Sequence, residues 1–145
     1  AQKGDTANAE TAYLAAAANG QEKAANKQLA NMYLKEAQAA LKGQKYADAY
    51  DAAMKSNSFV ESGNALYFAG MSAQKLGQNE KANEAFEQFL VVAPNDKKAD
   101  DIRCTLAVSY QKAGNKAKAV EYYQQILTNP KYTEVAKAQI EALGK

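Results

Sequence analysis

Histidine is absent from this 145-residue sequence, and cysteine occurs once, at Cys104. The chain therefore lacks the commonest general base and the commonest metal ligand, and it cannot form an internal disulfide. Arg103 is the only arginine among 18 cationic residues, and no basic stripe interleaved with aromatics occurs, so nucleic acid is not an expected partner. No run of 18 apolar residues occurs, so no membrane span is expected. These absences predict a protein without metal, cofactor or catalytic activity.

Proline is also scarce, with only Pro94 and Pro130 in the chain, so long helices are possible over most of its length. Alanine, the best helix former, is abundant, whereas valine and isoleucine are sparse. No segment alternates apolar and polar residues for long enough to indicate a strand. The sequence predicts an all-α protein, and its formal charge of +2 is spread evenly along the chain.

Glycine, Asn–Gly and proline positions divide the chain into eight expected helices. Their ranges are 6–18, 22–42, 46–55, about 58–76, 79–92, about 96–113, a seventh helix that runs to about 127, and 133–143. Ser58 and Glu61 match the capping-box pattern and are expected to open the fourth helix. Asn95 or Asp96 is expected to cap the sixth helix.

One spacing occurs three times in this sequence. A glycine is followed five residues later by alanine and nine residues later by an aromatic residue. The three sets are Gly4, Ala9 and Tyr13; Gly77, Ala82 and Phe86; and Gly114, Ala119 and Tyr123. A small residue and an aromatic residue one helical turn apart, at a constant distance from a glycine, indicate an internal repeat.

The spacing resembles that of the tetratricopeptide repeat, in which large, small and aromatic positions recur over 34 residues. The two clearest matches are Leu66, Ala69, Gly70, Ala73, Ala82, Phe86 and Pro94, and then Arg103, Leu106, Ala107, Tyr110, Ala119, Tyr123 and Pro130. A degenerate earlier repeat has Tyr33, Ala37, Ala40, Ala49 and Ala53. The resemblance implies a right-handed α-solenoid of antiparallel helix hairpins.

The resemblance also implies how a single repeat domain over residues 1–145 is divided. It gives a half repeat at 1–20, a degenerate repeat at 21–57, repeats at 58–94 and 95–130, and a capping helix at 131–145. Gly77 and Gly114 are 37 residues apart, three more than the consensus length, so a longer turn is expected at residues 95–98. Arg103 stands where the family prefers tryptophan or another large apolar residue.

In this family the first helix of each hairpin lines a concave groove that binds a partner. Carried over to this chain, the groove positions are Asn31, Leu34, Gln38 and Leu41, then Asn64, Tyr67, Met71 and Gln74, and then Asp101, Cys104, Val108 and Gln111. This mixture of aromatic, thioether, apolar and amide groups suits an extended or helical peptide better than a highly charged one. The alternative is that these side chains only cover the groove or pack against the long helix at 22–42.

Other candidate sites in the sequence have simpler explanations. The groove positions offer no lysine or arginine, which argues against a carboxylate clamp for a peptide C-terminus. Cys104 has no histidine to activate it, so a structural role is expected. The acidic residues near Asp96 lack the glycine turn and distal glutamate of a calcium loop. Tyr110, Tyr122 and Tyr123 are explained first by core packing rather than by sugar stacking.

The expected function is a non-catalytic scaffold that binds a protein or peptide partner in the groove. One alternative is a structural spacer or oligomerisation module, with a possible homo-oligomer through the N-terminal helix. A second alternative is a non-catalytic domain of a larger enzyme or envelope-assembly machine. The compartment stays open between cytoplasm and export. Ala1 as a mature N-terminus favours export, whereas the alignment of Gly4, Ala9 and Tyr13 favours a start within a repeat.

Overall fold

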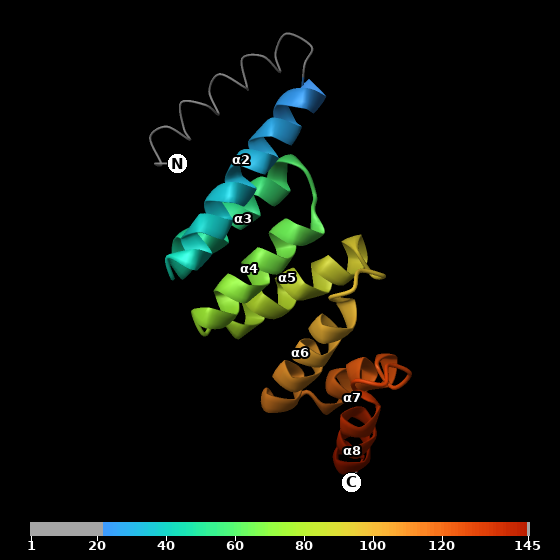
Figure 1. Cartoon of the computed structure of the whole chain (residues 1–145). Helices are drawn as coiled ribbons and strands as arrows, with labels where there is room; N and C mark the ends of the chain where they lie inside the picture. The colour runs from blue at the N-terminus through green and yellow to red at the C-terminus, as the bar shows by residue number, and fades with distance from the viewer. Residues whose placement is uncertain (1–21, 145) are drawn as a thin grey trace. The chain divides into compact units, whose positions relative to one another are not determined.

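The computed structural model describes residues 22–144, which form seven helices and no strand (Figure 1). The helices are α2 (Glu22–Lys42), α3 (Tyr46–Phe59), α4 (Gly63–Lys75), α5 (Asn79–Val92), α6 (Ala99–Lys112), α7 (Lys116–Gln125) and α8 (Thr133–Leu143). The prediction of an all-α protein is confirmed. The helix expected at residues 6–18, and with it the half repeat at 1–20, lies outside the described residues.

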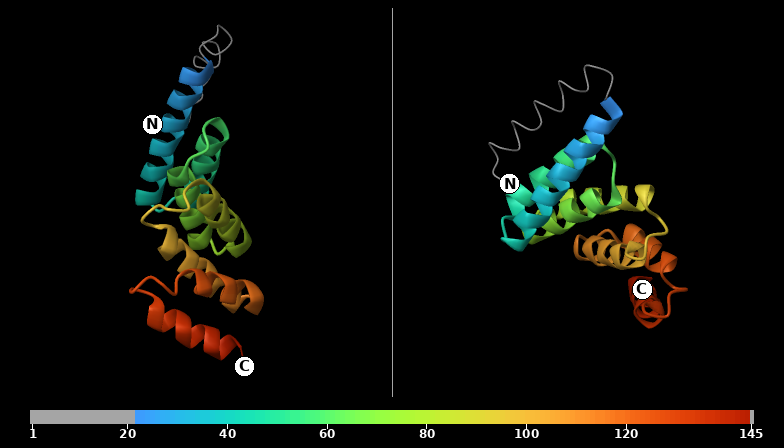
Figure 2. Two further views of the ribbon diagram at one scale, coloured as in Figure 1. Left: turned by 90° about the vertical axis from the view of Figure 1, so that its right-hand side faces the viewer. Right: turned by 45° about the horizontal axis from the view of Figure 1, so that its top comes forward.

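Two compact units make up the chain, Ala1–Val92 and Ala93–Lys145. In the first unit, α2 packs against α3, α3 against α4 and α4 against α5, and α2 also contacts α4. In the second unit, α6 packs against α7 and α7 against α8. Consecutive helices within each hairpin run in opposite directions (Figure 2). The predicted helix hairpins are therefore present in both units.

The bounds of α2, α5 and α8 are those that the sequence predicts. The predicted end of α3 at residue 55 is wrong, because α3 continues to Phe59. Tertiary contacts stabilise this last turn. The buried Ser56 hydroxyl donates to the Ala30 carbonyl of α2 at 2.7 Å, and the Phe59 ring stacks on Tyr33 with 6.0 Å between ring centroids. Packing against a neighbouring helix has thus extended α3 beyond its local signals.

The predicted capping box that begins at Ser58 is also wrong. The Ser58 hydroxyl instead donates to the Lys55 carbonyl at 2.6 Å within α3. Val60 is extended, and the N-cap of α4 is Ser62, whose Oγ accepts from the Ala65 backbone N–H at 3.3 Å. A serine side chain can bond back to the preceding turn or cap the next helix. Ser58 does the first and Ser62 does the second.

The prediction that Asn95 or Asp96 caps α6 is likewise wrong. Lys98 occupies the N-cap position and makes no side-chain cap bond. The Asp96 carboxylate accepts from the Lys98 backbone N–H at 2.8 Å, so Asp96 closes the turn that precedes the helix. The prediction of a longer turn is confirmed, since the six residues 93–98 separate α5 from α6.

The first helix of each hairpin (α2, α4 and α6) is followed by a turn in which one residue has a positive, left-handed φ angle. The φ angle is 75° at Gly77, 84° at Gly114 and 59° at Gln44. In each turn the following backbone N–H bonds back five residues, from Lys45 to Ala40, from Gln78 to Ala73 and from Asn115 to Tyr110. The repeated turn therefore also occurs after α2, where glutamine adopts a conformation that only glycine adopts without strain.

Gln44→Gly is expected to raise the free energy of unfolding by about 1 kcal/mol, because it removes left-handed strain. Gly77→Ala and Gly114→Ala should lower it by about the same amount. No atom lies within 4 Å of a Cβ added at either glycine, so these two variants introduce backbone strain alone. Chemical denaturation measures the three changes, with Gln44→Ala as the control that keeps the strain. Destabilisation by Gln44→Gly would contradict this account of the turn.

Small residues let the helices of the first unit approach closely. One buried cluster contains Ala37, Ala52, Ala53, Ala69 and Ala85, with Tyr50, Met54 and Phe68 packed against it. Gly70 is buried on α4, and a Cβ at this position would lie 2.4 Å from the nearest ring atom of Phe86 on α5. The aromatic ring therefore lies directly over the glycine, and this contact fixes how closely α4 and α5 pack.

The core of the second unit draws on all three of its helices. Ala107, Ala119, Tyr123, Ile126 and Ala136 are buried together. Ala107 follows Gly70 by 37 residues, and Tyr123 follows Phe86 by the same distance. Both units thus place a small residue of the first helix and an aromatic residue of the second helix in the hairpin core. Ala136 brings α8 into the core of the second unit.

Candidate partner-binding faces

The residues predicted to contact a partner occupy equivalent places on three helices. They define an α2 face (Asn31, Leu34, Gln38 and Leu41), an α4 face (Asn64, Tyr67, Met71 and Gln74) and an α6 face (Asp101, Cys104, Val108 and Gln111). Consecutive sets are 33 and 37 residues apart. The left-handed residues Gln44, Gly77 and Gly114 have the same separations, so each face stands at one constant distance before its turn.

The α4 face combines two exposed amides with two half-buried side chains, Tyr67 and Met71. The Tyr67 ring centroid lies 6.5 Å from that of Phe86 and 6.3 Å from that of Phe89, both on α5. Aromatic pairs at this separation stabilise packing. Tyr67 therefore supports the α4–α5 hairpin.

The α2 face, like the α4 face, combines two amide side chains with two apolar or aromatic ones. Asn31 and Gln38 are exposed, and Leu34 and Leu41 are half-buried. None of the eight positions on these two faces carries a charged residue. Because α2 contacts α4 within the first unit, the two faces belong to neighbouring helices and offer uncharged, partly apolar surface.

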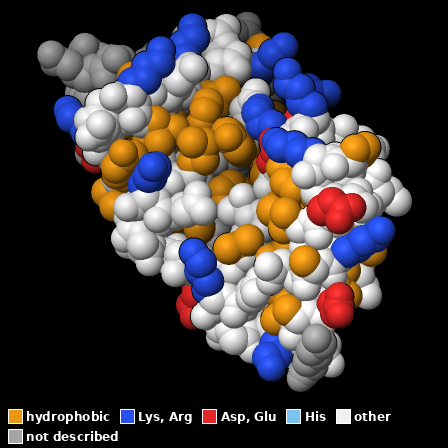
Figure 3. All heavy atoms as spheres, turned by 60° about the horizontal axis from the view of Figure 1, so that its bottom comes forward, with side chains coloured by type: hydrophobic (Ala, Val, Ile, Leu, Met, Phe, Trp, Pro, Cys, Tyr) orange, Lys and Arg blue, Asp and Glu red, His pale blue; other side chains and the backbone are white. Residues whose placement is uncertain are grey.

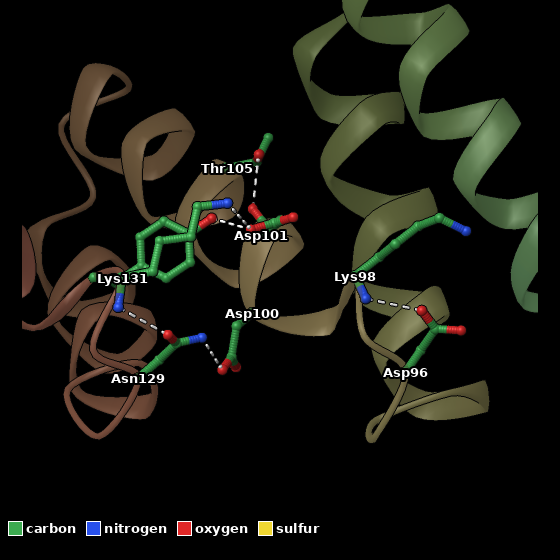
Figure 4. Close-up of polar contacts among 8 residues, drawn as sticks. Asp96, Lys98, Asp100, Asp101, Thr105, Asn129 and Lys131 are labelled. Carbon is green, nitrogen blue, oxygen red and sulfur yellow. Dashed lines mark hydrogen bonds and ion pairs between the residues drawn. The ribbon is translucent and has the colours of Figure 1, made fainter.

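The α6 face is engaged at its N-terminal end by the turn that precedes α8 (Figure 4). The Asp101 carboxylate accepts hydrogen bonds from the Tyr132 hydroxyl and from Lys131 Nζ, the latter at 3.1 Å. Both hydrogen bonds lower the pKa of Asp101 below its ordinary value, and the bond from Tyr132 has the larger effect. The charge of Asp101 is therefore balanced by the chain's own residues.

At the other end of the α6 face, Gln111 links three helices. Its Oε1 accepts from the Tyr123 hydroxyl of α7 at 2.7 Å, and its Nε2 donates to Gln139 Oε1 of α8 at 2.8 Å. Both hydrogen-bonding ends of this amide are thus used inside the second unit. Gln74, at the equivalent place on the α4 face, is exposed.

Cys104 and Val108 complete the α6 face, and both pack against the core cluster that includes Ala136 of α8. Burial raises the pKa of the Cys104 thiol, and the nearby negative charge of Asp101 raises it further by a smaller amount. A thiol with a raised pKa is a poor nucleophile at neutral pH. The geometry therefore fits the structural role that the sequence predicts for Cys104.

The sequence does not predict the polar network around Asp100, of which Figure 4 shows the bond from Asn129. Asp100 forms an ion pair with Arg103 at 2.7 Å and accepts from Asn129 Nδ2 at 2.9 Å. Arg103 also donates to the Pro94 carbonyl at 3.0 Å. Arg103 thus fills the large-residue position of the repeat through polar contacts. The ion pair could have been predicted, because an aspartate in the first turn of a helix is followed three residues later by an arginine.

Neither a metal site nor a membrane helix stands out in the described part of the chain. Residues 22–144 contain no group of three or more Cys, Asp or Glu side chains that could hold a metal ion. Over this same range, no helix is long and apolar enough to cross a bilayer.

Hydrophobic side chains are visible on the surface in Figure 3, and Val91 is 79% exposed. Exposed apolar side chains do not by themselves mark a binding surface, so position in the repeat is what identifies the faces.

Comparisons with known proteins agree with this geometry. A family model described as tetratricopeptide repeat matches residues 64–96 and 105–131. A comparison with curated proteins gives no match. Among solved structures, the chain is similar to the Arabidopsis OM64 TPR domain, with a TM-score of 0.64 and 13% identity over 81% of this chain and 96% of that one.

The chain is also similar to the Yersinia enterocolitica type III secretion chaperone SycD in complex with a peptide of the translocator YopD. That match has a TM-score of 0.61 and 19% identity, and covers 79% of this chain and 91% of that chain. A structure of SycD described as an alternative dimer matches with a TM-score of 0.58 and 18% identity, over 81% and 92%. At these identities the likeness concerns the fold, and the predicted α-solenoid fold of helix hairpins is confirmed.

Proposed function

We propose, on the match of the tetratricopeptide-repeat model to residues 64–96 and 105–131, that the chain is a non-catalytic scaffold that binds a segment of a partner protein. The binding surface is formed by the α2 and α4 faces of the first unit. Asn31, Leu34, Gln38, Asn64, Tyr67, Met71 and Gln74 contribute to it. The remaining predicted contacts, Asp101, Val108 and Gln111, serve the second unit's own packing.

The contrast between the α4 and α6 faces carries this proposal. On the α6 face, Asp101 bonds to Lys131 and Tyr132, and Gln111 bonds to Gln139. On the α4 face, the equivalent side chains Asn64 and Gln74 are exposed, while Met71 and Val108 are half-buried alike. Side chains that remain at the surface beside apolar groups are available to an incoming segment.

A peptide as partner is supported by one of the similar structures. SycD was solved with a peptide of the translocator YopD, so the same fold accommodates a peptide in that protein. Non-catalytic function is supported by the absence of histidine from the sequence, since histidine is the commonest general base. Burial of the Cys104 thiol supports it further.

The test uses short random peptides displayed in a library and selected on the immobilised protein. Selected peptides should bind the variant Leu34→Ala with Met71→Ala at least about tenfold more weakly, because anchoring side chains are removed. Tyr67 is left intact because its ring contacts Phe86 and Phe89. Val108→Ala is the matched control, since Val108 is equivalent to Met71 but packs within the second unit, and it should bind as the wild type does.

Two results would contradict the proposal. Peptides that bind the double variant as tightly as the wild type would move the binding site away from the α2 and α4 faces. A selection that yields no peptide, together with a dimer in sedimentation experiments that the double variant disrupts, would favour the alternative of an oligomerisation module. Circular dichroism of each variant confirms that the helices are retained.

A further inference from the structure

Folding separates the two signs of charge in the first unit. Residues 22–92 contain eight lysines and eight acidic residues, so this part of the chain has no net charge. Lysines predominate on α2, whereas α3 and α5 together carry five acidic residues and two lysines. We infer that copies of this chain associate head to tail, with the exposed lysines on α2 of one copy against the exposed carboxylates on α3 and α5 of the next.

The lysine surface consists of the four lysines of α2, all of them exposed: Lys23, Lys27, Lys35 and Lys42. At 3.6 residues per turn, the last three lie on the side of the helix opposite the buried Leu29 and Tyr33. No ion pair joins any of the four to another residue of the described chain. Glu36, the only acidic residue between them, is half-buried, and its Oε2 has no hydrogen-bond partner within residues 22–144. The positive charge of this surface is therefore available to a partner.

The acidic surface consists of Asp51 on α3 with Glu80 and Glu84 on α5, and all three are exposed. Burial raises the pKa of the Tyr50 hydroxyl, and the charges of Glu84 and Asp51 raise it further, so carboxylates of both helices lie near this ring. Lys81 of α5 already lies over the same ring, with its Nζ 5.4 Å from the ring centroid. Lys55 of α3 lies over Tyr33 at 5.2 Å. The exposed carboxylates thus give this side of the unit its negative charge.

The two surfaces lie on opposite sides of the first unit. The contacting helices α2 and α4 pack against α3 and α5, respectively, and Ala53 of α3 shares a buried cluster with Ala85 of α5. On α3, Asp51 lies opposite the buried Ala53. On α5, Glu84 lies opposite the buried Phe86. Each surface therefore points away from the other layer of helices, so the lysines of one copy can meet this acidic surface only on a second copy.

The spacing of the charges allows several pairs to form at once. Lys23 and Lys27 are one helical turn apart, about 6 Å along the axis, as are Glu80 and Glu84. Facing surfaces of opposite charge steer association and fix its register. Because the two surfaces differ, a dimer keeps one free surface of each sign, and further copies can add to it. Exposed ion pairs are weak and screened by salt, so association is expected at high protein concentration and low salt.

Sedimentation of the purified chain at increasing concentration tests the inference. At an ionic strength of about 0.01 M the mass should rise with concentration, and at about 1 M the chain should stay monomeric, because salt shortens the range of charge interactions. Lys27→Glu with Lys35→Glu should weaken association at least about tenfold, because it places like charges against each other. Asp51→Lys with Glu84→Lys should have the same effect.

Mixing these two charge-reversed variants separates pairing between the surfaces from a general effect of charge. The unchanged acidic surface of one variant can meet the unchanged lysine surface of the other, and their two reversed surfaces also match. The mixture should therefore associate, although neither variant does so alone. Lys116→Glu with Lys137→Glu is the control, because it makes the same charge change at exposed positions of the second unit, and it should associate as the wild type does. Circular dichroism verifies that each variant keeps its helices.

A chain that stays monomeric at low salt would overturn the inference, and so would association that neither salt nor the charge reversals weaken. A mixture that fails to associate would show that the two surfaces do not pair with each other. A monomer that binds a polyglutamate peptide through Lys27 and Lys35 would assign the lysine surface to an acidic partner instead of a second copy. The inference goes beyond the proposed function and does not depend on it, since Leu34→Ala with Met71→Ala tests that function separately.

Discussion

Gly70→Ala is expected to lower the free energy of unfolding by about 1–3 kcal/mol, although alanine is the better helix former. The added Cβ would lie 2.4, 2.6 and 2.8 Å from three ring atoms of Phe86. Phe86 is only 3% exposed, so its ring cannot turn into solvent to make room. The clash therefore exceeds the gain of about 1 kcal/mol that helix propensity alone would give.

Chemical denaturation gives the size of this effect, and the larger Gly70→Leu variant should lose more stability than Gly70→Ala. Shortening the opposing side chain tests the mechanism, because Gly70→Ala combined with Phe86→Leu should lose less than the sum of the two single changes. A Gly70→Ala protein more stable than the wild type would mean that α4 and α5 separate freely at this contact.

Ala119→Leu is expected to destabilise the second unit by about 1–3 kcal/mol or more, because it overpacks a closed core. Ala119 is fully buried and lies in one cluster with Ala107, Tyr123 and Ala136. The extra methyl groups would have to displace side chains from three different helices. We therefore expect α8 to loosen together with the α6–α7 contact.

Ala117→Leu is the control for Ala119→Leu, because Ala117 is exposed on the same helix. Its stability should stay within about 0.5 kcal/mol of the wild type. Thermal melts of both variants, read by circular dichroism, compare the same substitution at a buried and an exposed site. Equal stability of the two variants would refute the alignment of Ala119 with the buried position of the repeat.

Features that follow from local periodicity were predicted well from the sequence. The glycines at 77 and 114, the scarcity of proline and the repeated alanine and aromatic spacing led to the correct fold class. They also gave the bounds of α2, α5 and α8. Such features depend on residues close together in the chain, whose preferences act whatever the rest of the molecule does.

Features that depend on distant residues were missed. The extension of α3 to Phe59 needs the carbonyl of Ala30 and the ring of Tyr33, and neither is visible in the local sequence. Ser58 satisfied the capping pattern, yet its hydroxyl bonds back to Lys55. The positive φ angle of Gln44 was not predicted, because Gly43 immediately before it is the residue expected to adopt such a conformation in a turn.

The candidate faces were predicted as positions, but their different surroundings were not. The bonds from Lys131 and Tyr132 to Asp101 join residues about thirty positions apart. Repeat consensus treats α4 and α6 as equivalent, since it describes only the residues that the repeats share. The α6 face differs from the α4 face because residues after Asn129 form hydrogen bonds to it. The consensus spacing has no counterpart of that segment.

The hydrogen bonds of Asp101 and Gln111 to the turn and helix that follow α7 have a consequence for grafting and for divergence. A helix pair cut out after α7 would leave a carboxylate and an amide without their partners. The smallest portable module of the second unit is therefore the trio α6, α7 and α8. In related chains, substitutions at Asp101 and Gln111 should be inherited together with substitutions at Lys131, Tyr132 and Gln139.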